Sequence, residues 1–240
     1  MILFFVVKKK TVLLGCLLVC AVTVMVICGA LHERQEIARA AFSVPAANKV
    51  VVIDAGHGGF DAGASDNGVQ EKDINLDVAL RLKEYIEQGG GVAVLTRDED
   101  VSTADPSRSG TSAKQSDLSE RKKLADTSGA DIFVSIHMNK FPQAQYKGAQ
   151  VFYSPEPEGG KRLGEEIQQS LKDVLQDGNE RVAKKIDGGV FILKNTAIPS
   201  VIVECGFLSN PQEAELLQQE GYRQKLAWAV YMGITRYFNQ

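Results

Sequence analysis

Short apolar runs rich in β-branched residues alternate with segments of helical periodicity from residue 50 onward, and this alternation constrains the fold most strongly. The predicted strands are Val50–Asp54, Val92–Leu95, Ile132–Ile136, Ala149–Tyr153 and Val201–Val203. The predicted helices are Asp73–Glu87, Asp117–Asp126, Arg162–Leu175, Gln212–Gln219 and Tyr222–Tyr237. Because the strands are apolar throughout, both faces of their sheet must be covered. The pattern therefore predicts a single α/β domain with helices on both faces of a central sheet.

The segment between the second strand and the second helix is expected to be a loop. Arg97–Ser116 is polar and rich in Asp, Ser and Thr. The residues Asp117-Leu118-Ser119-Glu120 that follow have the pattern of a capping box. We therefore expect the second helix to begin at Asp117.

The N-terminal segment indicates export. Three lysines, Lys8–Lys10, precede Thr11–Leu31, a run of 21 residues without a charge. As a helix this run is about 31 Å long, close to the thickness of a bilayer's hydrocarbon core. Since the lysines come first, the N-terminus is expected to stay in the cytoplasm while the rest is exported. A buried core helix is the alternative.

The predicted organisation has three parts. Residues 1–31 form a signal peptide or a signal anchor that contacts the membrane, and the sequence leaves the choice between them open. Residues 32–49 form a stalk, and residues 50–240 form the catalytic domain.

Composition excludes several classes of protein. The chain is 44% hydrophobic and 24% charged, which fits a packed globule rather than a disordered chain. Its formal net charge of −3 offers no polycationic face, so no nucleic-acid partner is expected. Three of the four cysteines, Cys16, Cys20 and Cys28, lie in the N-terminal segment, which excludes a disulfide scaffold.

Two histidines and two glutamates could form a metal site. His57 and His137 each follow a predicted strand, Glu71 precedes a predicted helix, and Glu204 ends the last strand. Ligands bind at the carboxyl ends of strands in open α/β sheets, and zinc accepts two His and one Glu while a fourth position stays open. The spacing alone also fits ordinary turn histidines and surface glutamates. The glycines beside His57 favour a ligand site, because they allow the backbone to approach a ligand closely.

Five motifs occur in an order that resembles the zinc-dependent N-acetylmuramoyl-L-alanine amidases of the amidase-3 family. They are VIDAGHGG (52–59), EKDINL (71–76), LTR (95–97), SIHMN (135–139) and VECGFLSN (203–210). The resemblance implies a six-stranded sheet, one Zn²⁺ held by His57, Glu71 and His137, and Glu204 as the catalytic carboxylate. It also implies peptidoglycan as substrate, cut at the amide between the lactyl group of N-acetylmuramic acid and L-alanine. An export segment before a bare catalytic domain is most similar to the members that act in sporulation and germination.

Other residues near these motifs have two interpretations each. Asn139 either hydrogen-bonds the substrate or caps a turn, and Arg97 either clamps a stem-peptide carboxylate or forms a surface or loop-ordering salt bridge. Asp54 either orients His57 or caps the next turn. Cys205 is expected to be a buried thiol facing away from Glu204, because side chains alternate along a strand. The aromatic face of Trp228, Tyr231 and Tyr237 is expected to belong to the core rather than to a sugar-binding platform.

Two rival functions remain open from the sequence. The same metal ligands would serve another zinc peptidoglycan peptidase, and an inert peptidoglycan-binding module would need no catalytic Glu204. The sequence does not identify an activating protein partner.

Overall fold

The computed structural model describes residues 46–187, 190–194 and 196–239, together with residues 18, 22–25 and 29. The chain divides into two compact units, Met1–Val44 and Pro45–Gln240. The described residues of the first unit are helical and exposed. No helix among the described residues is long and apolar enough to cross a membrane. The predicted export segment and most of the predicted stalk lie outside the described residues.

The folded domain begins before the predicted end of the stalk at residue 49. Ala46 is fully buried, and the backbone N–H of Asn48 donates to the carbonyl oxygen of Gly90 at 3.0 Å. Residues 46–49 therefore belong to the folded unit.

Six strands form the central sheet, as the family resemblance implies. They are β1 (Val50–Ala55), β4 (Val92–Leu95), β5 (Ile132–Asn139), β6 (Gln150–Tyr153), β7 (Lys184–Lys185) and β8 (Ser200–Phe207). Their order is β4-β1-β5-β8-β6-β7, and every neighbouring pair is parallel except β6 with β8. A small antiparallel pair, β2 (Ser65–Asp66) and β3 (Val69–Gln70), precedes the first described helix of the domain. The sequence missed β7, because two exposed lysines carry no apolar pattern.

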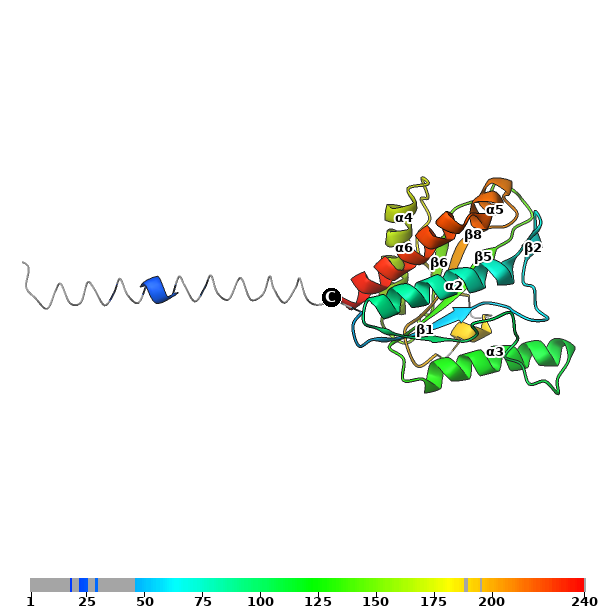
Figure 1. Ribbon diagram of the computed structural model, residues 1–240, viewed down its shortest axis with the longest axis horizontal. Coiled ribbons are helices and arrows are strands. Elements are labelled where there is room, and N and C mark those ends of the chain that lie inside the picture. The colour runs from blue at the N-terminus through cyan, green and yellow to red at the C-terminus, as the bar shows by residue number, and fades with distance from the viewer. Residues whose placement is uncertain are drawn as a thin grey trace, which may run out of the picture. The chain divides into compact units, whose positions relative to one another are not determined.

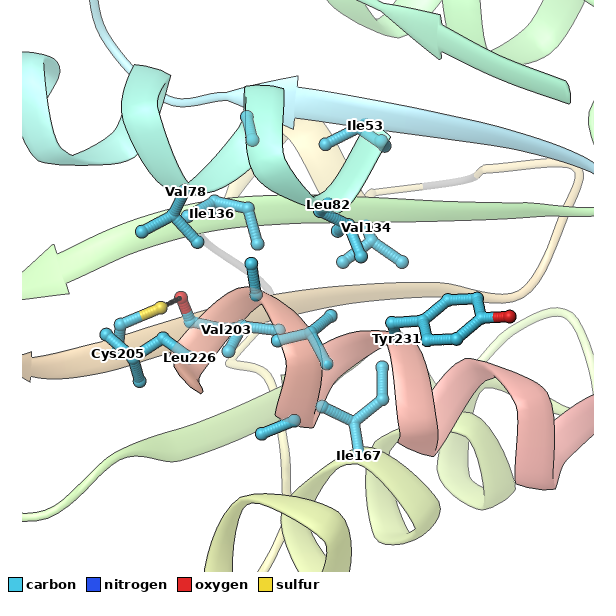
Figure 2. Packing of buried hydrophobic residues seen from close by; sticks show 14 of the residues in the cluster. Ile53, Val78, Leu82, Val134, Ile136, Ile167, Val203, Cys205, Leu226 and Tyr231 are labelled. Carbon is cyan, nitrogen blue, oxygen red and sulfur yellow. Dashed lines mark hydrogen bonds between the residues drawn. The ribbon is translucent and has the colours of Figure 1, made fainter. Parts of the chain in front are cut away.

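Helices cover both faces of the sheet, as predicted (Figure 1). The helices that pack on the larger core are α2 (Glu71–Gln88), α4 (Gly160–Leu175), α5 (Pro211–Gln218) and α6 (Glu220–Phe238). Figure 2 shows this core, where Leu82, Ile167 and Leu226 meet the strands. The opposite face is covered by α3 (Gly110–Thr127) and the 3-10 turn η1 (Phe191–Leu193). Figure 1 shows α3 on the far side of the sheet from α4 and α6.

Helix α3 begins seven residues before the predicted start at Asp117. The added residues, GTSAKQS, are almost entirely polar, so no apolar periodicity marked them as helical. Asp117 is therefore no N-cap but lies inside the helix. Its Oδ1 accepts a hydrogen bond from the backbone N–H of Thr103 at 2.7 Å, and its Oδ2 accepts one from Arg121 Nε at 2.6 Å.

Arg121 is a buried cation that joins α3 to the end of β1. Its side chain is 1% exposed and forms ion pairs with Asp54 at 2.8 Å and Asp117 at 2.6 Å. It also donates to the carbonyl oxygens of Ala55 at 2.7 Å and His57 at 2.6 Å. Burial alone would raise the pKa of Asp54. The charge of the Arg121 guanidinium acts in the opposite direction, and the resulting pKa lies below its ordinary value.

Replacing Arg121 by Met should lower the free energy of unfolding at neutral pH by about 3–5 kcal/mol, because the charge of Asp54 is left buried and unpaired. In the wild type, the lowered pKa of Asp54 stabilises the fold above about pH 4, and this contribution disappears as pH falls through the native pKa. In the variant, the pKa of Asp54 should rise instead. Denaturant unfolding should therefore show a difference that shrinks toward low pH. Lys123→Met, on the exposed side of α3, should change stability by less than about 0.5 kcal/mol.

Candidate active site

The pairing of β5 with β8 places His137 beside Glu204. The two residues are register partners, so both side chains leave the sheet on the same face, which is the α3 face. Cys205, one residue further along β8, faces the other core and is fully buried, as predicted. Burial raises the pKa of its thiol far above the ordinary value. Cys205 is therefore no nucleophile for this site.

His57 enters the site from the turn after β1. Its φ of 62° lies in the left-handed region that L residues rarely adopt, which indicates that surrounding contacts fix this turn. Gly56 allows the turn to lie against His137, since a Cβ at residue 56 would come within 2.3 Å of the His137 imidazole. These contacts explain why the sequence needs a glycine before His57.

Glu71, the first residue of α2, lies between the two histidines. Its Oε1 is 2.8 Å from His137 Nδ1, and its Oε2 is 3.2 Å from His57 Nε2. The backbone N–H groups of Ala64 and Met138 also donate to its carboxylate, at 2.7 and 3.0 Å. Burial raises the pKa of Glu71, but the hydrogen bonds from both histidines lower it more, so the carboxylate stays ionised.

The three side chains have the geometry of a metal site. One ligand atom from each of His57, Glu71 and His137 lies within 4.8 Å of the others, and this is the sole such group found among the described residues. Two imidazoles and one carboxylate are a ligand set that zinc accepts.

Asp61 orients His57, a role that the sequence analysis considered only for Asp54. His57 Nδ1 donates to Asp61 Oδ2 at 2.9 Å, which leaves Nε2 facing Glu71. Lys114 of α3 pairs with the same carboxylate oxygen at 3.1 Å. Asp54 instead accepts hydrogen bonds from Thr96, Arg121 and Ser135, so it neither orients His57 nor caps the turn. The spacing of four residues from His57 across a glycine turn is compatible with this contact but does not by itself distinguish Asp61 from other turn residues.

Glu204 is a partly buried residue in the wall of a cavity of about 500 Å³. Its Oε2 atom is buried and has no hydrogen-bond partner among the described residues. Burial is the largest influence on Glu204 and raises its pKa to about 7. His57 and His137 line the same cavity, so Glu204 faces the candidate metal ligands across shared space.

The two predicted substrate residues are placed differently. Asn139 lines the cavity. Arg97 is only 4% exposed and is not among the residues that line the cavity. It donates to four backbone carbonyls, those of Ala55, Gly56, Lys72 and Glu99. Arg97 therefore orders the loop, but through backbone carbonyls rather than through the expected salt bridge, and the structure does not bring it to the cavity as a substrate clamp.

The aromatic face of α6 packs mainly into the core, in line with the prediction. Tyr231 and Tyr237 are buried, whereas Trp228 is 39% exposed and stacks edge-on against Tyr85 of α2. This face packs on the α2 side of the sheet, opposite the cavity.

A family model described as N-acetylmuramoyl-L-alanine amidase matches residues 51–236. The chain belongs to this amidase family. The match covers the whole central sheet except Val50, the first residue of β1. It includes the four residues of the candidate site.

Several relatives of this amidase are similar over most of their length. The germination-specific N-acetylmuramoyl-L-alanine amidase of Bacillus subtilis is 37% identical over 200 residues, which are 83% of this chain and 84% of the relative. The amidase AmiA of Escherichia coli is 32% identical, with 80% of this chain and 76% of the relative covered. Among solved structures, the CwlD amidase of Clostridioides difficile in complex with the GerS lipoprotein superposes with a TM-score of 0.77. It is 43% identical and covers 80% of this chain and 99% of that one.

These similarities confirm the sequence-based prediction of an amidase of peptidoglycan. They also confirm the predicted α/β fold with a six-stranded sheet.

Proposed function

We propose that this amidase is a zinc-dependent hydrolase of the amide between the lactyl group of N-acetylmuramic acid and L-alanine. The observation that carries the proposal is the convergence of His57, Glu71 and His137 beside Glu204, whose buried Oε2 atom has no hydrogen-bond partner among the described residues. A ligand set of three leaves one coordination position open, which hydrolysis requires. Because Oε2 of Glu204 lacks such a partner, this carboxylate is better suited to act on the substrate than to stabilise the fold.

Each protein group has a distinct task in the proposed mechanism. Zinc, when bound, supplies a Lewis acid that polarises the scissile carbonyl and helps water act as a nucleophile near neutral pH. Glu204 takes a proton from the attacking water while the oxygen bonds to the carbonyl carbon. Glu204 then gives the proton to the nitrogen of L-alanine as the C–N bond breaks. Asp61 keeps the His57 ring in place throughout by its hydrogen bond to Nδ1.

Product analysis tests the cleavage site. Purified full-length chain in detergent would be incubated with zinc and peptidoglycan, and the products identified by mass spectrometry. We expect stem peptides with L-alanine at a new N-terminus and glycan strands without peptide. Cuts inside the stem would indicate a peptidase instead, and unchanged peptidoglycan despite bound zinc would indicate an inert binding module.

We extend the proposal to the peptidoglycan of the spore cortex. The relative from Bacillus subtilis described as germination-specific matches this chain over 84% of its own length, which supports a similar arrangement of the two proteins. Peptidoglycan of the spore cortex and of the vegetative wall should therefore both be tested as substrates. We expect faster release of peptides from cortex peptidoglycan than from the vegetative wall.

The position of the catalytic unit outside the cytoplasmic membrane is a further part of this proposal. It is supported by Lys8–Lys10 and the uncharged run that follows them. A C-terminal reporter that is active only in the cytoplasm should give no signal, and strong signal would contradict export. An exported lipoprotein is the class of partner to test by cross-linking, because the similar CwlD structure is a complex with the GerS lipoprotein.

Replacing Asp61 by Asn should weaken zinc affinity by about 10–100-fold. The amide keeps the size of the side chain but removes the charge, and His57 loses its anionic partner at 2.9 Å. Competition with a coloured chelator measures the affinity. Asp66→Asn, a carboxylate on β2 that pairs with Lys140, serves as the matched control and should leave zinc affinity unchanged. Equal affinity in Asp61→Asn and the wild type would show that Asp61 does not support the site.

A further inference from the structure

A second, smaller cleft adjoins the catalytic cavity. Its volume is about 230 Å³, and its lining residues are Asn139, Phe141, Tyr146, Arg181 and Phe207. We refer to these five residues as the aromatic cleft. Three of them carry aromatic rings, and no carboxylate lines the cleft.

The sheet register places the aromatic cleft next to the catalytic cavity. Asn139 pairs with Phe207 in the next register pair beyond His137 and Glu204, after a shift between residues 137 and 139. The same Asn139 lines both the catalytic cavity and the cleft. A molecule that is held in the cavity and extends past Asn139 would therefore enter the cleft.

Two of the three rings in the cleft are exposed although they are apolar, whereas the third, Phe207, is only 4% exposed. Phe141 is 45% exposed and Tyr146 is 41% exposed, and their rings meet edge to face with centroids 4.8 Å apart. The Arg181 guanidinium lies 4.8 Å from the centroid of the Phe207 ring. Exposed aromatic surface beside a few polar groups is typical of a site for a ligand with an apolar face and a polar rim.

The loop that carries Phe141 and Tyr146 is held in place by the turn after β8. Ser209 Oγ accepts a hydrogen bond from the backbone N–H of Phe141 at 3.1 Å. Asn210 Nδ2 donates to the carbonyl oxygen of Ala144 at 2.9 Å. Because the backbone is anchored at both points, little ordering of this loop is needed when a ligand binds.

We propose that the aromatic cleft binds the N-acetylmuramic acid ring whose lactyl amide is cut. This inference rests on the proposed function. Only the lactyl Cα and the ether oxygen separate the scissile carbonyl carbon from the sugar ring, so the ring must lie directly beside the catalytic cavity. The C–H face of a pyranose packs well against aromatic rings. The side-chain amide of Asn139 lies where it can bind the hydroxyl or acetamido groups at the rim.

The charges around the catalytic cavity and the aromatic cleft favour a place for the stem peptide on the α3 side of the cavity, away from the aromatic cleft. The Arg181 guanidinium donates to the carbonyl oxygen of Lys147 at 2.8 Å and to Gln150 Oε1 at 2.9 Å, so much of its donor capacity is used within the protein. Lys114, on the α3 side of the catalytic cavity, pairs with Asp61 at 3.1 Å but is 55% exposed, and its ammonium group has three donors, so donors remain for a ligand. A peptide that carries carboxylates is better matched to Lys114, and an uncharged sugar face is better matched to the rings.

Binding without turnover tests this assignment. Titration calorimetry on the full-length chain in detergent would use two probes, a peptide-free glycan tetrasaccharide and the free stem peptide. Tyr146→Ala and Phe141→Ala should each weaken glycan binding by about tenfold, the size of one aromatic contact. Both should leave peptide binding unchanged. Tyr146→Phe, which keeps the ring, and Trp228→Ala, which removes an exposed ring of α6, should bind glycan like the wild type.

Three outcomes would overturn the assignment. They are no measurable glycan binding by the wild type, unchanged glycan affinity in both alanine variants, or a loss confined to the peptide. If one of the two alanine variants has a lowered melting temperature, the glycan affinity of the other variant decides whether the assignment stands. The proposed hydrolysis is judged separately by the released peptides, so glycan binding without peptide release would contradict the reaction and leave the cleft assignment standing.

Discussion

Glu204→Gln should lower the rate of peptidoglycan hydrolysis by about 10²–10⁴-fold, the usual contribution of a positioned acid or base. The amide keeps the size and hydrogen-bonding capacity of the side chain but cannot accept a proton from water. Because Oε2 of Glu204 makes no hydrogen bond to any residue that the structure describes, the change should leave the fold intact. Zinc content should also stay at the wild-type level, since His57, Glu71 and His137 already supply three ligands. Rate, zinc content and melting temperature would be measured on the same preparation.

The same substitution at Glu120, an exposed residue of α3, is the control and should have the activity of the wild type. Near-normal hydrolysis by Glu204→Gln with zinc present would mean that another group moves the proton. Loss of zinc from Glu204→Gln would instead make Glu204 a ligand, and Glu71 would become the candidate base.

His57→Ala and His137→Ala should each remove most of the bound zinc and all measurable hydrolysis. Each histidine supplies one of three ligand atoms that lie within 4.8 Å of one another, and two remaining ligands bind zinc weakly. The expected fold defect is small for His57, which lies on a turn, and larger for His137, which lies within β5. Elemental analysis of the purified variants measures the metal. Full zinc occupancy in both variants would rule out the assigned site.

The sequence was most informative where local pattern and tertiary structure agree. The strands that carry the site are short β-branched runs, and their parallel pairing follows from the helices between them. The position of His137 and Glu204 on one face follows from strand alternation, which also places Cys205 in the opposite core. Both strands continue past their predicted ends, so these two residues lie within strands rather than after them.

Features fixed by distant polar contacts were not predictable from the sequence. The first two turns of α3 are almost entirely polar, with Ala113 as their one buried apolar side chain, so the sequence shows no apolar periodicity there. Asp54 and Arg97 lie within the motifs, yet both are buried. Asp54 pairs with Arg121, and Arg97 donates to the backbone carbonyls of Ala55 and Gly56. Asp61 could not be distinguished from other turn residues without the position of the His57 ring, because its role depends on a single contact.

Zinc reconstitution tests the account most directly. Full-length chain stripped with a chelator would be titrated with zinc while the release of peptides with N-terminal L-alanine is followed. The account predicts no release from the metal-free chain, a linear return of activity up to one zinc per chain, and no return in His57→Ala. Full activity of the metal-free chain, or equal recovery in His57→Ala, would contradict a hydrolytic site built on His57, Glu71 and His137.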